Sequence, residues 1–155
     1  QATAITPNVP SRRDVLRTVD AELAAVLDDK AHGWSSTLVA RAVHALRLAG
    51  AVALGRQPAS HLVEGEPRPD RLVVSAGRVR RRRFEVSSAV TPVDIRRAIA
   101  ALPATAPAAE RDALETLATS LAVLSGILYR DPFLADGTLD EAVESGRRAA
   151  RQVRR

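Results

Sequence analysis

Arginine dominates the side chains of this sequence that could recognise a ligand. The segment RVRRRRFEV, residues 78 to 86, carries five arginines: Arg78, Arg80, Arg81, Arg82 and Arg83. A guanidinium keeps its positive charge at any physiological pH, and its planar donors match the oxygens of phosphates and carboxylates. We therefore take these five residues as candidates for binding nucleic acid or an acidic protein partner.

The overall charge favours the same class of partner. The 155 residues include 23 basic and 18 acidic side chains, and Lys30 is the only lysine, which leaves a net charge of +5. A positive balance of this size promotes attraction to polyanions and acidic surfaces, but it says nothing about the fold. Arginine in place of lysine, together with abundant alanine, is also typical of a GC-rich bacterial genome, so arginine content by itself identifies no partner.

Residues suited to catalysis or metal binding are sparse. The chain has no cysteine, and His32, His44 and His61 do not have the spacing of paired metal ligands on a helix. The glycine-rich phosphate loop, the dinucleotide fingerprint and the nucleophile elbow are all missing from the sequence. We predict a binding protein with no catalytic, cofactor-binding or metal-binding residues. An enzyme that uses arginines and acids in an unrecognised way is the weaker alternative.

The elements that must position these side chains are mostly helical. Residues 1–10 have no periodicity and read as an extended arm, and 11–155 as a single helical domain with a β-hairpin insertion near 71–86. Capping residues and apolar stripes predict four of the helices at 12–29, 37–49, 92–102 and 139–153, started by Ser11, Ser36, Thr91 and Thr138. The second helix should end at Gly50, and Asp136-Gly137 should form a turn before the last one.

The longest apolar pattern, at 107–129, predicts a further helix. Its leucines recur at intervals of three and four residues: Leu114, Leu117, Leu121, Leu124 and Leu128. This spacing is that of a heptad seam, but it lasts for only two heptads. A helix packed in the core of its own chain is favoured, and a homodimer through 107–129 is the alternative. The Asp131-Pro132 pair should end this helix.

Short apolar runs between the second and third helices predict strands. Ala51 to Leu54 reads as a short strand, 57–70 as a loop, and 71–75 and 78–86 as a hairpin turning at Ala76-Gly77. Arginines occupy both faces of the segment 78–86, so neither face is cleanly apolar. We therefore predict an edge or protruding strand, on which arginine either prevents unwanted pairing or forms a cationic stripe for a partner.

The order of elements from 21 to 75 resembles a winged helix-turn-helix, in which a recognition helix leads into a strand and a wing. The resemblance implies that Ser35, Ser36, Thr37, Arg41 and His44 face the major groove of DNA. It also implies that Arg56 and the 57–70 loop lie at the wing. The seven-residue connection before the second helix is long for such a motif and favours the alternative, a helical hairpin with a polar outer face.

These patterns predict a mainly α protein of about five helices with a small β-hairpin and no cofactor. The expected function is non-enzymatic binding, nucleic-acid-associated or regulatory, through a basic surface. The candidate residues are Thr37, Arg41, His44, Arg78, Arg80, Arg81, Arg82 and Arg83. The alternative is a helical adaptor or assembly subunit for an acidic protein or a membrane-associated partner. No apolar run is long enough to span a membrane. We expect a cytoplasmic location, with an upstream signal or anchor left open because the chain begins at Gln1.

Overall fold

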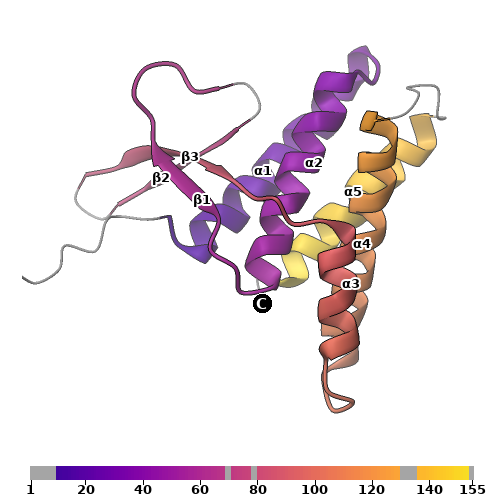
Figure 1. Ribbon diagram of the computed structural model, residues 1–155. Helices are drawn as coiled ribbons and strands as arrows, with labels where there is room; N and C mark the ends of the chain where they lie inside the picture. Colours follow the sequence, from indigo (N-terminus) through magenta and orange to yellow (C-terminus); the bar gives the residue numbers. More distant parts are fainter. Residues whose placement is uncertain (1–9, 69–70, 78–79, 130–135, 154–155) are drawn as a thin grey trace, which may run out of the picture.

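The computed structural model describes residues 10–68, 71–77, 80–129 and 136–153, and it is mainly helical with a small antiparallel sheet (Figure 1). In chain order the elements are α1 (Arg12–Asp29), a short 3-10 helix (Lys30–His32), α2 (Ser36–Ala53), β1 (Ala59–Leu62), β2 (Leu72–Ala76), β3 (Arg82–Ser87), α3 (Pro92–Ala101), α4 (Ala108–Tyr129) and α5 (Asp136–Val153). The predicted fold class, with strands inserted between the second and third helices, is confirmed.

Helix α2 is the centre of the molecule. Its apolar residues cover most of its circumference, and Ala45, Leu46, Leu48 and Ala49 are completely buried. Helices α1, α4 and α5 pack around it, while α3 lies along α4 and the sheet projects from the other side of the bundle (Figure 1). A helix that is apolar on nearly all sides must be enclosed by others, and this requirement organises the whole bundle.

Helix α2 is longer than predicted at both ends. Its N-cap is Ser35, whose side chain accepts from the backbone N–H of Leu38, so the prediction of Ser36 as the cap was wrong. The predicted strand at 51–54 was also wrong, because the helix continues through Gly50 and ends at a turn formed by Gly55, with φ +70°. The backbone N–H groups of Gly55 and Arg56 close this turn on carbonyls of the last helical residues.

Gly50 is a packing residue rather than a helix stop. A Cβ atom at this position would lie 3.0 Å from the side chain of Val90 and 3.3 Å from that of Ile95. The missing side chain therefore lets the segment between β3 and α3 lie directly on α2. The sequence predicted that Gly50 ends the helix. A glycine that follows an apolar stripe looks the same in the sequence whether it ends a helix or makes room for a neighbouring side chain.

The sheet has three strands in the order β1–β3–β2, so the arginine-rich strand is central and the prediction of an edge strand was wrong. Strand β1 comes from the segment predicted as a loop, and β3 begins only at Arg82. Phe84 and Val86 are buried on one face of β3. Glu85 is buried on the other face, where it accepts from the backbone N–H of Arg68 at 2.9 Å. Both faces of β3 are thus covered over these residues.

The heptad leucines of α4 belong to the core of this chain. Leu114, Leu117, Leu121 and Leu124 are each at most 5% exposed, because α4 packs against α2, α3 and α5. The prediction of a core helix is confirmed. Helix α5 starts at Asp136, so the predicted turn at Asp136-Gly137 was wrong and the Thr138 cap lies inside the first turn. The predicted helix break at Asp131-Pro132 lies outside the described residues.

Asp20 connects the first and last helices. Its carboxylate accepts from Nε of Arg147 at 3.0 Å and from Nε of Arg151 at 2.7 Å. Burial by itself would raise the pKa of Asp20, but the hydrogen bonds from Arg151 and Arg147 outweigh burial and lower it. A lowered pKa means that the folded state favours the charged carboxylate, so this stabilisation exists above the unfolded pKa and disappears as pH falls through the folded one.

We predict that Asp20→Asn lowers the free energy of unfolding by about 1 kcal/mol at neutral pH, because two arginines then face a neutral amide in a partly solvated site. The difference from the wild type should shrink as pH falls through the lowered, folded-state pKa of Asp20, because the carboxyl is then protonated in both states. Urea unfolding at several pH values measures both effects. Asp28→Asn, on an exposed part of α1, is the matched control; an equal loss there would contradict the role of Asp20.

Candidate anion-binding sites

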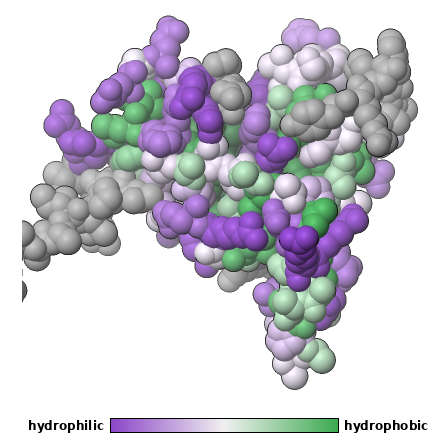
Figure 2. Space-filling view, viewed as in Figure 1, coloured by the Kyte–Doolittle hydropathy of each residue, from purple (hydrophilic) through white to green (hydrophobic). Residues whose placement is uncertain are grey.

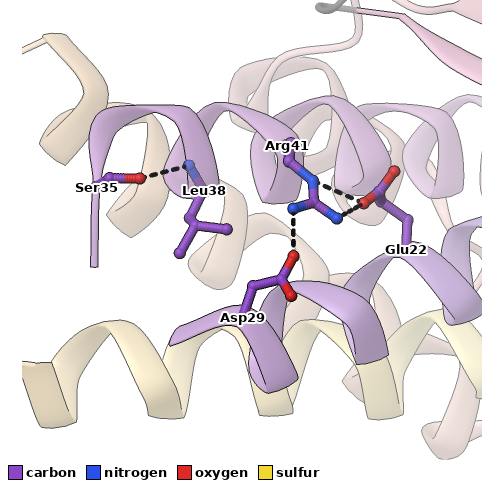
Figure 3. Close-up of polar contacts among 5 residues, drawn as sticks. All are labelled: Glu22, Asp29, Ser35, Leu38 and Arg41. Carbon is purple, nitrogen blue, oxygen red and sulfur yellow. Dashed lines mark hydrogen bonds and ion pairs between the residues drawn. The ribbon is translucent and has the colours of Figure 1, made fainter. Parts of the chain in front are cut away.

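The polar residues predicted on α2 have different surroundings. Thr37 is exposed in the first turn. Arg41 donates from Nε to Glu22 and from Nη1 to Asp29, at 2.8 Å in each case (Figure 3). The hydrogen bond to Asp29, followed by that to Glu22, raises the pKa of Arg41. Arg41 therefore holds α1 against α2, and its charge is already matched by two carboxylates.

The geometry of α2 differs from that of the recognition helix which the winged-helix resemblance implied. Such a helix needs an exposed face along its length to enter the major groove, and a strand should follow it directly. Here most of α2 is buried in the bundle, Arg41 on its polar face is bound to two acids of α1, and residues 51–53 continue the helix. The alternative, a helical hairpin made of α1 and α2, describes this part of the chain.

The arginine run forms an exposed cluster, Arg80–Arg83, which we call the arginine tip. It lies where the chain passes from β2 into β3, at the outer end of the sheet and away from the helices (Figure 1). Hydrophilic side chains gather at this end of the molecule (Figure 2). Arg78, the remaining candidate of the run, lies outside the described residues. The tip is thus the part of the predicted basic surface that the structure displays.

No acid within the described residues forms an ion pair with the arginine tip, and all four of its side chains are exposed. The only polar contact described for them is a 3.4 Å bond from Arg81 to the carbonyl of Ser75. Two exposed acids, Glu64 and Glu66, follow β1 at the same end of the sheet and reduce the local positive charge. Phe84 is buried, so it offers no ring for stacking on a base.

A second cationic site lies at the opposite end of the sheet, next to α2. It is a cavity of about 550 Å³, which we call the cationic cavity. Among the described residues its lining contains three arginines and no acid; these lining residues are His44, Arg47, Ala51, Arg56, Gln57, Ala59, Arg71, Ser87, Ser88, Ala89 and Val90. The volume falls in the range of small-molecule sites in proteins, about 300–1,000 Å³.

Two parts of the fold bring the walls of the cationic cavity together. His44, Arg47 and Ala51 share one face of α2, because they are spaced by three and four residues. The facing wall comes from the strand ends, where Arg71 donates to the hydroxyl of Ser87. The close contact of Val90 with Gly50 holds this wall against the helix. The cavity therefore depends on the packing of the sheet connection against α2.

Acids flank the cationic cavity without lining it. Nη1 of Arg56 lies 3.6 Å from the carboxylate of Asp94. Hydrogen bonds from the backbone and side chain of Thr91 lower the pKa of Asp94, and the charge of Arg56 contributes less. Hydrogen bonds from Arg68 lower the pKa of Glu85, and the charge of Arg71 adds to the effect. Each of these acids has a structural partner of its own, so the cavity keeps an excess of positive charge.

Sequence reasoning identified only part of the cationic cavity. His44 was a candidate residue and lines it, and Arg56 was predicted to lie at the wing of a winged helix-turn-helix, whereas it lines this cavity just after the end of α2. Arg47 and Arg71 were missed. A signal for Arg47 was present, since it lies one helical turn after His44 on the same face, whereas nothing in the sequence brings Arg71 to α2.

Comparisons with known proteins identify no relative. No protein-family model, no curated protein and no solved structure matches the chain. Over the described residues, no helix has both the length and the apolar character needed to cross a membrane.

Proposed function

We propose that this chain is a non-enzymatic binding protein that attaches to the phosphate backbone of nucleic acid through the arginine tip. The observation that carries the proposal is the exposure of Arg80–Arg83 with no acid paired to them in the described chain. Unpaired surface arginines release counterions when they meet phosphates, and this release supplies sequence-independent affinity. The projecting position of the tip leaves room for a long polymer.

The same features support backbone contact rather than base reading. Base recognition requires side chains that enter a groove or rings that stack on unpaired bases. The buried ring of Phe84 and the enclosed helix α2 provide neither at the tip. We therefore expect similar affinity for nucleic acids of unrelated sequence.

Salt dependence of the wild-type protein tests this function. Two labelled DNA duplexes of about 20 base pairs and unrelated sequence would be titrated by fluorescence anisotropy from about 50 to 300 mM NaCl. We expect both affinities to fall in parallel as salt rises. The logarithm of the association constant, plotted against the logarithm of the salt concentration, should have a slope of about −2 to −4, as a few phosphate contacts require. An affinity that ignores salt, or no binding at the lowest salt, would contradict the proposal.

A second candidate function is that of an adaptor for an acidic protein surface. One observation favours it: Leu62, at the end of edge strand β1, is 44% exposed and pairs with Phe84 in the sheet. An apolar side chain beside arginines suits a protein partner better than a phosphate backbone. Competition separates the two, because a short peptide of alternating glutamate and leucine should displace DNA only if the acidic protein surface is the better ligand.

A further inference from the structure

The cationic cavity has features that packing of the fold does not require. Arg47 and Arg71 each leave the side-chain Nε buried without a hydrogen-bond partner in the described structure. An unsatisfied buried donor costs free energy, and for a charged group the cost is larger than for a neutral one. Two such donors at the lining of one cavity lower the stability of the folded protein unless a ligand accepts their hydrogen bonds.

Charge points to the kind of ligand that would offset this cost. The lining of the cationic cavity carries three guanidinium groups, from Arg47, Arg56 and Arg71, and no carboxylate from the part of the chain that the structure describes. Asp94 lies near Arg56 but also closes the cap of α3, and Glu85 near Arg71 is bonded to Arg68. A single carboxylate would leave much of this charge unmatched, whereas a diphosphate carries several negative charges and many acceptor oxygens.

The surrounding residues supply hydroxyl and imidazole groups as well as charge. Ser87 accepts from Arg71, and its hydroxyl retains a proton that can be donated. His44, which already interacts with another group, lines the same cavity from α2. Guanidinium, hydroxyl and imidazole groups around one concave space are the donors that phosphate oxygens use.

We propose that the cationic cavity binds a small molecule that carries a diphosphate or a comparable cluster of phosphate oxygens, held by Arg47, Arg56 and Arg71. The site is separate from the arginine tip, because β1, β2 and β3 have the cavity at one end and the tip at the other. A polymer backbone would meet the projecting tip, whereas the cavity is concave and has the volume of a small ligand. The inference therefore goes beyond nucleic-acid binding.

Inorganic pyrophosphate is the probe for the test, with NaCl at equal ionic strength as the comparison. We expect pyrophosphate to bind saturably by calorimetry and to raise the unfolding temperature, whereas NaCl alone should do neither. The double variant Arg47→Met, Arg56→Met should weaken pyrophosphate binding by about tenfold or more, because charge-assisted hydrogen bonds are lost. This variant should fold, since methionine fills the space of the Arg47 side chain as far as the position of Nε and replaces the buried donor that has no partner by an apolar group.

The matched control is Arg82→Gln, Arg83→Gln at the arginine tip, which removes two positive charges far from the cavity. Its affinity for pyrophosphate should stay within about twofold of the wild type, since long-range charge effects are screened at physiological salt. An equal loss in both variants would show that only net charge matters and would overturn the site. If pyrophosphate does not bind saturably to the wild type, the proposed cavity site is also overturned. That result would leave the proposal of DNA binding by the arginine tip unaffected.

A second measurement uses the unmodified chain. In ¹H–¹⁵N spectra, the buried Nε–H groups of Arg47 and Arg71 should give signals protected from exchange with water. Titration with pyrophosphate should shift these signals before those of the exposed tip arginines. Shifts confined to the tip would contradict the proposal even if calorimetry detects binding.

Discussion

Replacing Arg80–Arg83 by glutamine is expected to weaken binding to duplex DNA by tenfold or more at about 100 mM salt. The four side chains are exposed and have no ion pair among the described residues, so their removal takes away phosphate contacts without breaking the fold. The log–log salt slope should become shallower by about 2 to 3, since each lost phosphate contact contributes slightly less than one. Glu64 and Glu66 at the same end reduce the local positive charge, so we expect the change in slope to be smaller than the loss of four full phosphate contacts would give.

The control for the tip variant must remove equal charge elsewhere. Arg96 and Arg97 are exposed on α3, and Arg12 and Arg13 are exposed at the start of α1; changing all four to glutamine lowers the net charge by the same amount. We expect this control to retain most of the DNA affinity and most of the salt slope. If the control variant loses as much DNA affinity as the tip variant does, affinity follows net charge alone, and the arginine tip is not the binding site.

Gly146→Leu is expected to destabilise the protein by about 3 kcal/mol. Gly146 lies where α5 crosses α2 and α4, and a Cβ atom there would be 2.8 Å from Cδ2 of Leu46 and 3.3 Å from Cβ of Ser120. Leu46 is fully buried and Ser120 is 3% exposed, so neither has space to move away. The helices must separate to admit the new side chain, which should lower the unfolding temperature by roughly 6–12 °C.

Gly126 provides the matched control, because it is also a helical glycine but lies on the exposed side of α4. Apart from the adjacent residues and the backbone of α4 itself, no atom of the described residues would lie within 4 Å of a Cβ atom at this position. Gly126→Leu should therefore stabilise the protein by about 0.5–1 kcal/mol, since leucine has the better helix propensity. Urea unfolding of both variants measures the difference, and destabilisation of similar size at the two positions would contradict the close packing described for Gly146.

Local rules determined much of the fold from the sequence. The capping box of Thr91 and Asp94 and the proline at the first helical position start α3 as predicted. The apolar stripe of α1 and the leucine spacing of α4 predicted buried helix faces, and those faces are buried. These predictions depend on residues within about one helical turn of each other, and such contacts are encoded directly in the order of the residues.

The strands and the end of α2 were predicted less well, because their outcome depends on distant neighbours. Strand β3 is central only because the unpredicted strand β1 pairs with it, and β1 is a four-residue segment with one exposed leucine and no apolar alternation. Gly50 continues a helix because Val90 and Ile95, far along the chain, occupy the space beside it. Short apolar segments and single glycines have several local solutions, and tertiary contacts select among them.

The candidate sites divide in the same way. The sequence by itself determined that positive charge is concentrated at residues 80–83, since the kind and density of charged residues can be read directly from their order. Only the tertiary structure decided which arginines stay available: it matched Arg41 with two acids of α1 and left Arg80–Arg83 exposed. It also brought Arg71 to Arg47 across one cavity. The physical reason is that a guanidinium interacts only with groups that lie close to it in the folded structure. For residues that are far apart in the chain, the fold alone sets these distances.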